Sequence, residues 1–266
     1  MFKMPKCVLI IAGSDSGAGA GIQADLKTAA ARGVYGMTAI TAITAQNTTG
    51  VEKVQLLEGE MVGAQVDAVT RDFPVDAVKT GMLGSEEIVR VIAERARRNQ
   101  WPKVVVDPVM VAKSGDPLLE EDARLAIRQE LFPLALVITP NIPEAEMLCG
   151  ITIESIADMR EAARTLHRQG PAFVLLKGGH LREGKELVDV LFDGKKFYYY
   201  RAARVETRNN HGTGCTYASA IAAGLAMGET VPLAVRNARI YLQAILPFGF
   251  GLGKGSGPMN HFSGLI

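Results

Sequence analysis

Short apolar runs alternate along the chain with longer segments in which apolar residues have a helical spacing. Runs rich in β-branched and aliphatic residues predict buried strands, because a strand covered on both faces needs no polar alternation. The predicted strands are Val8–Ala12, Met37–Thr44, Ala77–Val78, Lys103–Val106, Leu136–Ile138 and Phe173–Leu176.

The helical segments lie between these runs or follow them. They are Gly21–Arg32, Gly59–Arg71, Ser85–Gln100, Gly214–Met227 and Pro232–Leu246. In the third of them, acidic residues come first and arginines last, an arrangement that complements the helix dipole.

A hairpin is predicted late in the chain. The apolar runs Leu187–Phe192 and Lys196–Tyr200 flank Asp193-Gly194, a dipeptide typical of a tight β-turn. Strands that alternate with helices predict an α/β fold, in which helices cover both faces of a mostly parallel sheet and this hairpin lies near an edge. Neither a linker nor an internal repeat interrupts the pattern, so we expect one domain over residues 1–266.

Composition narrows the class of protein. Of 266 residues, 48% are hydrophobic and 21% charged, which is typical of a soluble globular enzyme. A formal net charge of +1 favours neither nucleic acid nor an anionic membrane as a partner. The early apolar run Cys7–Ala12 is too short to span a bilayer, and we expect no cleavable signal peptide. The three cysteines lie too far apart to indicate a disulfide framework, so we expect a cytoplasmic protein.

Polar residues follow most of the predicted strands. In open α/β sheets, ligands bind beyond the carboxyl ends of the strands. Turns alone would explain glycine and proline there, but not repeated Asp, Lys, Asn and Gln, so we expect a binding site at this edge. The segments concerned are Gly13-Ser14-Asp15, Gln46-Asn47, Lys79-Thr80-Gly81, Asp107-Pro108, Thr139-Pro140-Asn141 and Lys177-Gly178-Gly179.

Two common phosphate-binding motifs do not match. The only candidate for a P-loop, Gly253-Lys254, is followed by glycine, and the dinucleotide motif begun by Gly17 and Gly19 has Ile22 in place of its third glycine. The segment His211–Cys215, which reads His-Gly-Thr-Gly-Cys, leads instead into a helix of small residues. Glycines at a helix start let backbone N–H groups approach an anion, although they also suit a plain turn.

These residues resemble the hydroxymethylpyrimidine and phosphomethylpyrimidine kinases, a branch of the ribokinase-like superfamily. The resemblance covers nearly the whole chain, through short motifs in a fixed order. The motifs are Ala12–Gly17, Gly21–Lys27, Thr44–Thr48, Lys79–Leu83, Val106–Met110, Thr139–Glu144, Lys177–His180, His211–Cys215 and Gly257–Phe262.

The resemblance implies a ribokinase-like three-layer α/β/α sandwich around a central, mostly parallel sheet, and usually a homodimer. It also implies a kinase of thiamin biosynthesis that uses ATP as co-substrate and Mg²⁺ as cofactor. Such an enzyme phosphorylates 4-amino-5-hydroxymethyl-2-methylpyrimidine and then converts the monophosphate to the diphosphate.

Several roles are carried over from the family to matching positions. Asp107, Asn141 and Glu144 would order the Mg²⁺, partly through water, since hard oxygens and retained waters suit that ion. Without the resemblance, Glu144 would also fit an acidic residue in the first turn of a helix, just after Pro143.

The remaining roles concern the two substrates. Lys177 and Thr213 would bind the nucleotide, and Gly212, Gly214 and Lys177 would take part in phosphoryl transfer. The expected substrate-binding residues are Gln46, Asp25, Met82 and Val109.

Cys215 occupies a position where most ribokinase-like enzymes have an aspartate that acts as the base. A helix N-terminus can lower the pKa of a thiol, so a thiolate base is feasible at this position. A small buried side chain with only a packing role fits the same position.

Two other functions remain open from the sequence. Some relatives with the same cysteine also phosphorylate pyridoxal, so a pyridoxal kinase is the alternative enzyme. A nucleotide-binding regulatory module without turnover is disfavoured, because Asp107, Asn141, Glu144 and the segment Gly212–Cys215 are all present.

Overall fold

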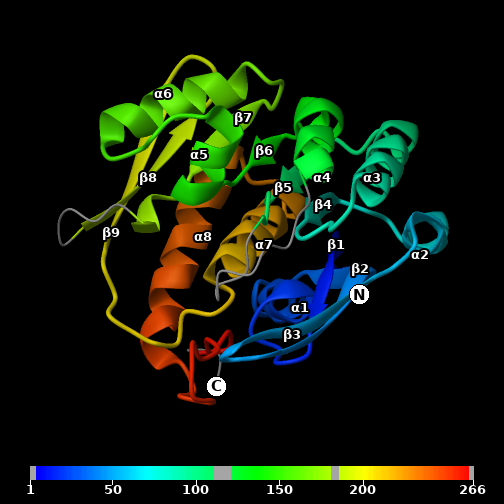
Figure 1. Ribbon diagram of the computed structural model, residues 1–266, viewed down its shortest axis with the longest axis horizontal. Helices are drawn as coiled ribbons and strands as arrows, with labels where there is room; N and C mark the ends of the chain where they lie inside the picture. The colour runs from blue at the N-terminus through cyan, green and yellow to red at the C-terminus, as the bar shows by residue number, and fades with distance from the viewer. Residues whose placement is uncertain (1–3, 111–120, 181–185, 264–266) are drawn as a thin grey trace.

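The computed structural model describes residues 4–110, 121–180 and 186–263 (Figure 1). Nine strands in these described ranges form one sheet in the order β3-β2-β1-β4-β5-β6-β7-β8-β9. They are β1 (Cys7–Asp15), β2 (Tyr35–Asn47), β3 (Gly50–Leu56), β4 (Ala77–Thr80), β5 (Val104–Val106), β6 (Val137–Ile138), β7 (Phe173–Leu176), β8 (Glu186–Phe192) and β9 (Phe197–Ala203).

The α-helices of the described ranges alternate with these strands. They are α1 (Gly21–Ala31), α2 (Gly59–Asp72), α3 (Glu86–Asn99), α4 (Glu121–Ala126), α5 (Ile142–Cys149), α6 (Ile156–His167), α7 (Thr213–Ala226) and α8 (Val231–Ile245). A π-helical turn over Ile127–Leu131 and a 3₁₀ turn over Phe132–Leu134 continue α4.

The alternation of side chains along β1 shows why both faces of the sheet are covered. Leu9 and Ile11 point to one face and join the core formed with helices α2 to α6. Val8 and Ile10 point to the opposite face and join the core formed with α1, α7 and α8. Figure 1 shows the resulting three layers. The predicted α/β/α sandwich is therefore confirmed.

Most of the sheet is parallel, as predicted. Strands β2, β1, β4, β5, β6 and β7 pair in parallel, and β8 and β9 form the predicted antiparallel hairpin at one edge. β8 also pairs antiparallel with β7, and a further antiparallel pair, β2 with β3, forms the opposite edge and was not predicted. Every residue of β3 is at least partly exposed, so this strand lacks the apolar run that marks the central strands.

The direction in which successive strands are added to the sheet reverses between β1 and β4. β1 lies between β2, which follows it in the chain, and β4, which comes after the β2–β3 hairpin. Ligands bind in open α/β sheets where the strand order reverses in this way. In the part of the chain that the structure describes, no helix is both long and apolar enough to cross a membrane.

Candidate active site

A lysine and an aspartate that follow two strands on either side of β6 form an ion pair at the carboxyl edge. The Nζ of Lys177, just after β7, lies 2.8 Å from Oδ1 of Asp107, just after β5. The Thr139 hydroxyl donates to the same oxygen at 2.9 Å. Burial alone would raise the pKa of Asp107, but Lys177 and Lys79 outweigh burial and hold that pKa below its ordinary value. Asp107 is therefore an anion with a fixed counter-charge.

Glu144 lies beside this pair at the start of α5. Asn141 caps the helix: its side chain accepts from the Glu144 N–H at 2.9 Å, while Glu144 Oε2 accepts from the Asn141 N–H at 2.8 Å. Burial raises the pKa of Glu144 to about 7, with Lys177 opposing the rise and Asp107 adding to it. Sequence reasoning offered a metal-ordering role and a helix-start role for Glu144, and the second of these is observed.

The donor set fits a divalent cation that keeps most of its water. Asp107 and Glu144 repel one another electrostatically, and a cation between them would relieve that repulsion. Carboxylate oxygens are ligands that Mg²⁺ prefers, usually together with retained waters. Within the described ranges, no group of three or more His, Cys, Asp and Glu side chains is arranged to hold a metal. These residues would therefore hold the ion together with water ligands, and not through protein ligands alone.

The N-terminus of α7 faces the same pair. Gly212 is the N-cap residue, with φ of +80°, and a Cβ there would lie 1.9 Å from the Gly19 carbonyl oxygen. A Cβ at Gly214 would lie 3.3 Å from Lys177 Nζ. Glycine is thus required for backbone approach at position 212, and it leaves space beside the lysine at position 214. The Thr213 hydroxyl donates to the Asn210 carbonyl at 2.5 Å. We call Asp107, Glu144, Lys177 and the start of α7 the charged half of the site.

Cys215 differs from the expectation of a lowered pKa. Burial raises the pKa of its thiol to about 11, and although Lys79 opposes the rise, Asp25 and Asp107 add to it. The helix N-terminus therefore does not dominate the environment of this thiol. The direction of this shift is opposite to the lowering that the helix start allowed for, and the role of Cys215 as a base stays a prediction.

Asp25 also differs from its expected place in the substrate pocket. The residue is fully buried on α1: its Oδ2 lies 2.8 Å from Lys79 Nζ, and its Oδ1 accepts from the Ser219 hydroxyl at 2.7 Å. Burial alone would lower the pKa of Lys79, but Asp25 outweighs it and raises that pKa. With both oxygens engaged, Asp25 here supports Lys79 beneath the site and offers no surface to a ligand.

The other predicted substrate residues lie at the carboxyl edge, and one of them lines a cavity. A cavity of about 300 Å³ is bounded by the β2–β3 turn from Gln46 to Gly50, by His211, and by Gly255 and Ser256. Met82 is buried just after β4, and the partly exposed Val109 follows β5. Of the four predicted substrate residues, Gln46 is the one that lines this cavity.

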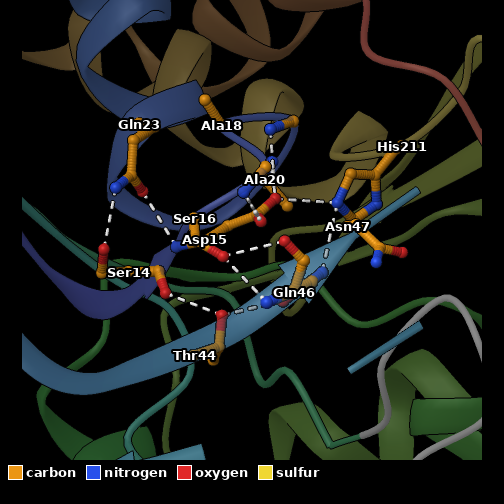
Figure 2. Close-up of polar contacts among 12 residues, drawn as sticks. Ser14, Asp15, Ser16, Ala18, Ala20, Gln23, Thr44, Gln46, Asn47 and His211 are labelled. Atoms are coloured by element: carbon orange, nitrogen blue, oxygen red, sulfur yellow. Dashed lines mark hydrogen bonds and ion pairs between the residues drawn. The ribbon is translucent and has the colours of Figure 1, made fainter. Parts of the chain in front are cut away.

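A polar network connects Gln46 to the loop before α1 (Figure 2). The Nε2 of His211 lies 2.8 Å from Asp15 Oδ2 and 3.2 Å from Gln46 Nε2. The Thr44 hydroxyl lies 3.2 Å from Gln46 Oε1 and donates to the Ser14 carbonyl at 2.9 Å. We call Asp15, Thr44, Gln46 and His211 the amide half of the site.

Sequence reasoning gave no role to Asp15, Lys79 or His211, although all three lie in motifs that carried the resemblance. Asp15 and His211 are 196 residues apart, and Asp25 and Lys79 are 54 apart. Polar residues after strands were the available signal for Asp15 and Lys79. His211 had only its place next to the glycines of the helix start.

Comparison with known proteins settles the family. The family model described as phosphomethylpyrimidine kinase matches residues 15–260. The chain belongs to the phosphomethylpyrimidine kinase family. A hydroxymethylpyrimidine/phosphomethylpyrimidine kinase of Rhizobium meliloti is 52% identical over 97% of this chain and 98% of its own length.

Some members of the phosphomethylpyrimidine kinase family are longer. The chain spans about half the length of relatives such as the thiamine biosynthesis bifunctional protein ThiED of Geobacter sulfurreducens, which is 52% identical over 96% of this chain and 52% of its own length.

Solved structures show the same fold. A phosphomethylpyrimidine kinase from Clostridium difficile 630 superposes with a TM-score of 0.79 at 46% identity, covering 89% of this chain and 97% of that one. A pyridoxal kinase from Staphylococcus aureus, in complex with AMP-PCP and pyridoxal, superposes with a TM-score of 0.90 at 37% identity, covering 99% and 96%. The expected ribokinase-like fold is confirmed.

Proposed function

We propose that the chain is an ATP-dependent kinase of thiamin biosynthesis. It phosphorylates 4-amino-5-hydroxymethyl-2-methylpyrimidine and then converts the monophosphate to the diphosphate. The names of relatives that match nearly end to end support this proposal, as does a structural neighbour that holds AMP-PCP.

The observation that carries the proposal is the junction of the two halves of the site. His211 belongs to the amide half, and the next residue along the chain, Gly212, is the N-cap of α7 in the charged half. A small molecule read by Gln46 would therefore lie close to the helix start that faces Lys177. A kinase needs this arrangement, because phosphoryl transfer depends mainly on positioning and on charge stabilisation.

In the charged half, backbone N–H groups at the start of α7 and the Lys177 ammonium stabilise the phosphoryl group in transit. Lys177 is well suited to that task. Burial would lower its pKa, but Asp107 and Glu144 outweigh burial and raise it, so the side chain stays charged. Thr213, the first residue of α7, is proposed to bind the nucleotide, and its hydroxyl donates to the Asn210 carbonyl.

Mg²⁺ would be held near Asp107 and Glu144, with Asn141 acting through its cap on Glu144. When bound, the ion supplies positive charge to the phosphate oxygens. Glu144, whose pKa burial raises to about 7, would be favoured in its ionised form by a positive charge beside it.

Cys215 is proposed as the group that takes the proton of the substrate hydroxyl. Because burial raises its pKa to about 11, the reactive thiolate is a minor form at neutral pH. The rate should therefore rise with pH in the neutral and mildly alkaline range, as expected for a base that titrates above the working pH.

In the amide half, Gln46 reads the substrate. A carboxamide offers acceptor and donor atoms side by side, and an aminopyrimidine presents the complementary pair, a ring nitrogen and an amine. Met82 and Val109 follow neighbouring strands at the same edge and are proposed to line the ring-binding space.

Pyridoxal is the second candidate substrate. The specific observation in its favour is the TM-score of 0.90 to a pyridoxal kinase, against 0.79 to a phosphomethylpyrimidine kinase of higher sequence identity. We propose that any activity on pyridoxal is secondary, because its ring nitrogen has no adjacent amine for the Gln46 amide to read.

We further propose a single kinase domain that forms a cytoplasmic homodimer. One continuous sheet in the described ranges supports the single domain. Exposed apolar residues on β2 and β3, including Ile43 and Val54, are compatible with a surface for a second copy. Light scattering after size exclusion should give twice the chain mass, whereas a monomer mass would contradict the dimer.

A coupled ADP-release assay tests the function. Purified protein receives Mg-ATP and, in parallel reactions, hydroxymethylpyrimidine, its monophosphate or pyridoxal. Turnover on both pyrimidines, with phosphorylated products identified by mass spectrometry, is expected. ADP release with pyridoxal alone would replace the proposed substrate, and release with none of the three would overturn the function.

A further inference from the structure

A histidine and an aspartate lie directly behind the Gln46 amide. His211 is 8% exposed and Asp15 is 3% exposed, so both polar groups have little access to water. In Figure 2, Asp15 and Gln46 approach the same nitrogen of the His211 ring, Nε2. The proton on this nitrogen therefore affects two partners at once.

The surroundings of Asp15 decide where that proton is. Its Oδ1 accepts from the Gly17 N–H at 2.8 Å, and its Oδ2 accepts from the N–H groups of Gly19 and Ala20 at 3.1 and 2.8 Å. Burial alone would raise the pKa of Asp15, but His211 and these N–H groups outweigh it and lower that pKa. Asp15 is thus an anion surrounded by donors. At 2.8 Å from such an anion, His211 Nε2 carries the hydrogen and donates it.

A protonated Nε2 has a consequence for the amide of Gln46. The amide nitrogen lies 3.2 Å from that ring nitrogen, which places a donor beside a donor. On its other flank, the amide oxygen faces Thr44 Oγ1, whose single hydrogen already has the Ser14 carbonyl as an acceptor at 2.9 Å. Half a turn of the terminal amide exchanges its two ends. The oxygen then accepts from His211, and the nitrogen donates to Thr44.

We propose that His211, fixed by Asp15, is a positioning residue that determines substrate specificity by setting the orientation of the Gln46 amide. In the orientation that His211 favours, the amide oxygen faces the imidazole and its second lone pair is free for an exocyclic amine. The second N–H of the amide is free for a ring nitrogen. The ligand read by this edge is a planar heterocycle with an amine beside a ring-nitrogen acceptor. The inference rests on the proposed reading of the substrate by Gln46.

The packing around His211 holds the ring in place for this task. A Cβ at Gly19 would lie 2.2 Å from the ring carbon Cδ2, so the loop before α1 reaches the imidazole only because that residue is glycine. The backbone N–H of His211 donates to the Gly257 carbonyl at 3.1 Å, which ties the residue to the C-terminal segment. The imidazole therefore has little freedom to turn away from Gln46.

A double-mutant cycle tests the coupling, with kcat and KM measured on hydroxymethylpyrimidine, pyridoxal and ATP. His211→Asn removes the donor at the ε position, whereas His211→Gln keeps one there. We expect His211→Asn to raise KM for the pyrimidine roughly tenfold, with a smaller change for pyridoxal and for ATP. His211→Gln should recover most of the loss. In a Gln46→Leu background, His211→Asn should cost nothing further, because the amide that it positions is gone.

A matched control is His167→Asn, at the end of α6, where the ring packs on Phe192. It should leave all three KM values unchanged. Equal losses from His211→Asn with and without Gln46 would overturn the inference, as would equal losses on all three ligands, because both results describe a general packing role. If Gln46→Leu itself changes nothing while the wild type turns over the pyrimidine, the reading by Gln46 fails and the kinase function stands.

A measurement on the unaltered protein covers the case in which His211→Asn does not fold. Imidazole nitrogen NMR should show a hydrogen on Nε2 of His211. A ring without that hydrogen would overturn the inference, because Nε2 would then have none to share between Asp15 and the amide.

Discussion

The charged half and the amide half of the site lie next to each other but are stabilised in different ways. In the charged half, Lys177 neutralises Asp107, and the buried Lys79–Asp25 pair lies beneath them. In the amide half, the reading group is neutral, and hydrogen bonds to His211 and Thr44 decide what it presents. Buried charges need partners to stay ionised, whereas a neutral amide needs only an orientation. Substitutions in the charged half should therefore slow every substrate, and substitutions in the amide half should change which substrate is preferred.

The largest effect is expected from Cys215→Ala. If the thiol is the base, this change should lower kcat by ~10²–10⁴-fold on both pyrimidine and pyridoxal, with KM values largely kept. Cys149→Ala, on α5, is the matched control and should leave kcat unchanged. Wild-type rates in Cys215→Ala would show that the thiol has only a packing role. Phosphoryl transfer would then depend on charge stabilisation and positioning alone.

The dependence of kcat on pH is a second test of Cys215 as the base. With a thiol whose pKa burial raises to about 11, kcat should rise steadily between pH 7 and pH 9. Cys215→Asp supplies a carboxylate, whose ordinary pKa of ~3.9 lies well below the ~8.5 of a thiol. Its rate should therefore rise at lower pH than the wild-type rate does and change less between pH 7 and pH 9. A flat profile in the wild type would contradict proton removal by Cys215.

Lys177→Met should lower kcat by ~10²–10³-fold, the usual worth of one group that stabilises transition-state charge. The loss should be similar for each acceptor, because the phosphoryl group is common to all of them. Lys195→Met, at the exposed β8–β9 turn, is the matched control. Thermal unfolding must accompany the kinetics, since Asp107 loses its partner. A loss confined to one acceptor would break the proposed division between the halves.

A smaller effect concerns Glu144 and folding stability. Burial raises the pKa of Glu144 from 4.5 to about 7, so the folded state binds a proton more tightly than the unfolded chain does. The resulting stability is fully present below pH 4.5 and is lost as pH rises through 7. Glu144→Gln keeps an oxygen for the Asn141 N–H and should remove this part of the pH dependence. Denaturant titrations from pH 4.5 to pH 8, without Mg²⁺, measure the free energy of unfolding of both proteins. If that free energy changes with pH equally in the wild type and in Glu144→Gln, Glu144 is not the group responsible.

The same variant tests the metal proposal. If Glu144 and Asp107 hold the ion, Glu144→Gln should raise the Mg²⁺ concentration needed for half-maximal turnover, because an amide holds the ion's water shell less well. An identical Mg²⁺ dependence in the two proteins would remove Glu144 from the metal site.

Local patterns predicted the parts of the fold whose signals are local. Phe173–Leu176 is a strand with the predicted bounds, and α7 and α8 begin within one residue of prediction. β3 was not predicted, because an edge strand with partly exposed residues has no apolar run. The short helix α5 is defined mainly by its cap at Asn141, a residue to which the resemblance assigns a role in ordering the metal.

The site was predictable where a residue type alone limits the chemistry, as with Asp107 and Lys177 after their strands. It was not predictable where function depends on a contact between distant segments. Asp15 and His211 meet only after folding, across 196 residues. The raised pKa of Cys215 depends likewise on burial and on carboxylates from other elements, which outweigh the helix start that the sequence does reveal.

The most direct test of the division between the two halves is the ratio of kcat/KM for hydroxymethylpyrimidine to kcat/KM for pyridoxal in two variants. Gln46→Leu should lower kcat/KM on the pyrimidine by roughly tenfold to a hundredfold, because the ligand's polar edge loses its partner, and should affect pyridoxal less. The ratio therefore falls in Gln46→Leu, while it stays at the wild-type value in Lys177→Met. An unchanged ratio in Gln46→Leu, or a shifted one in Lys177→Met, would contradict the account.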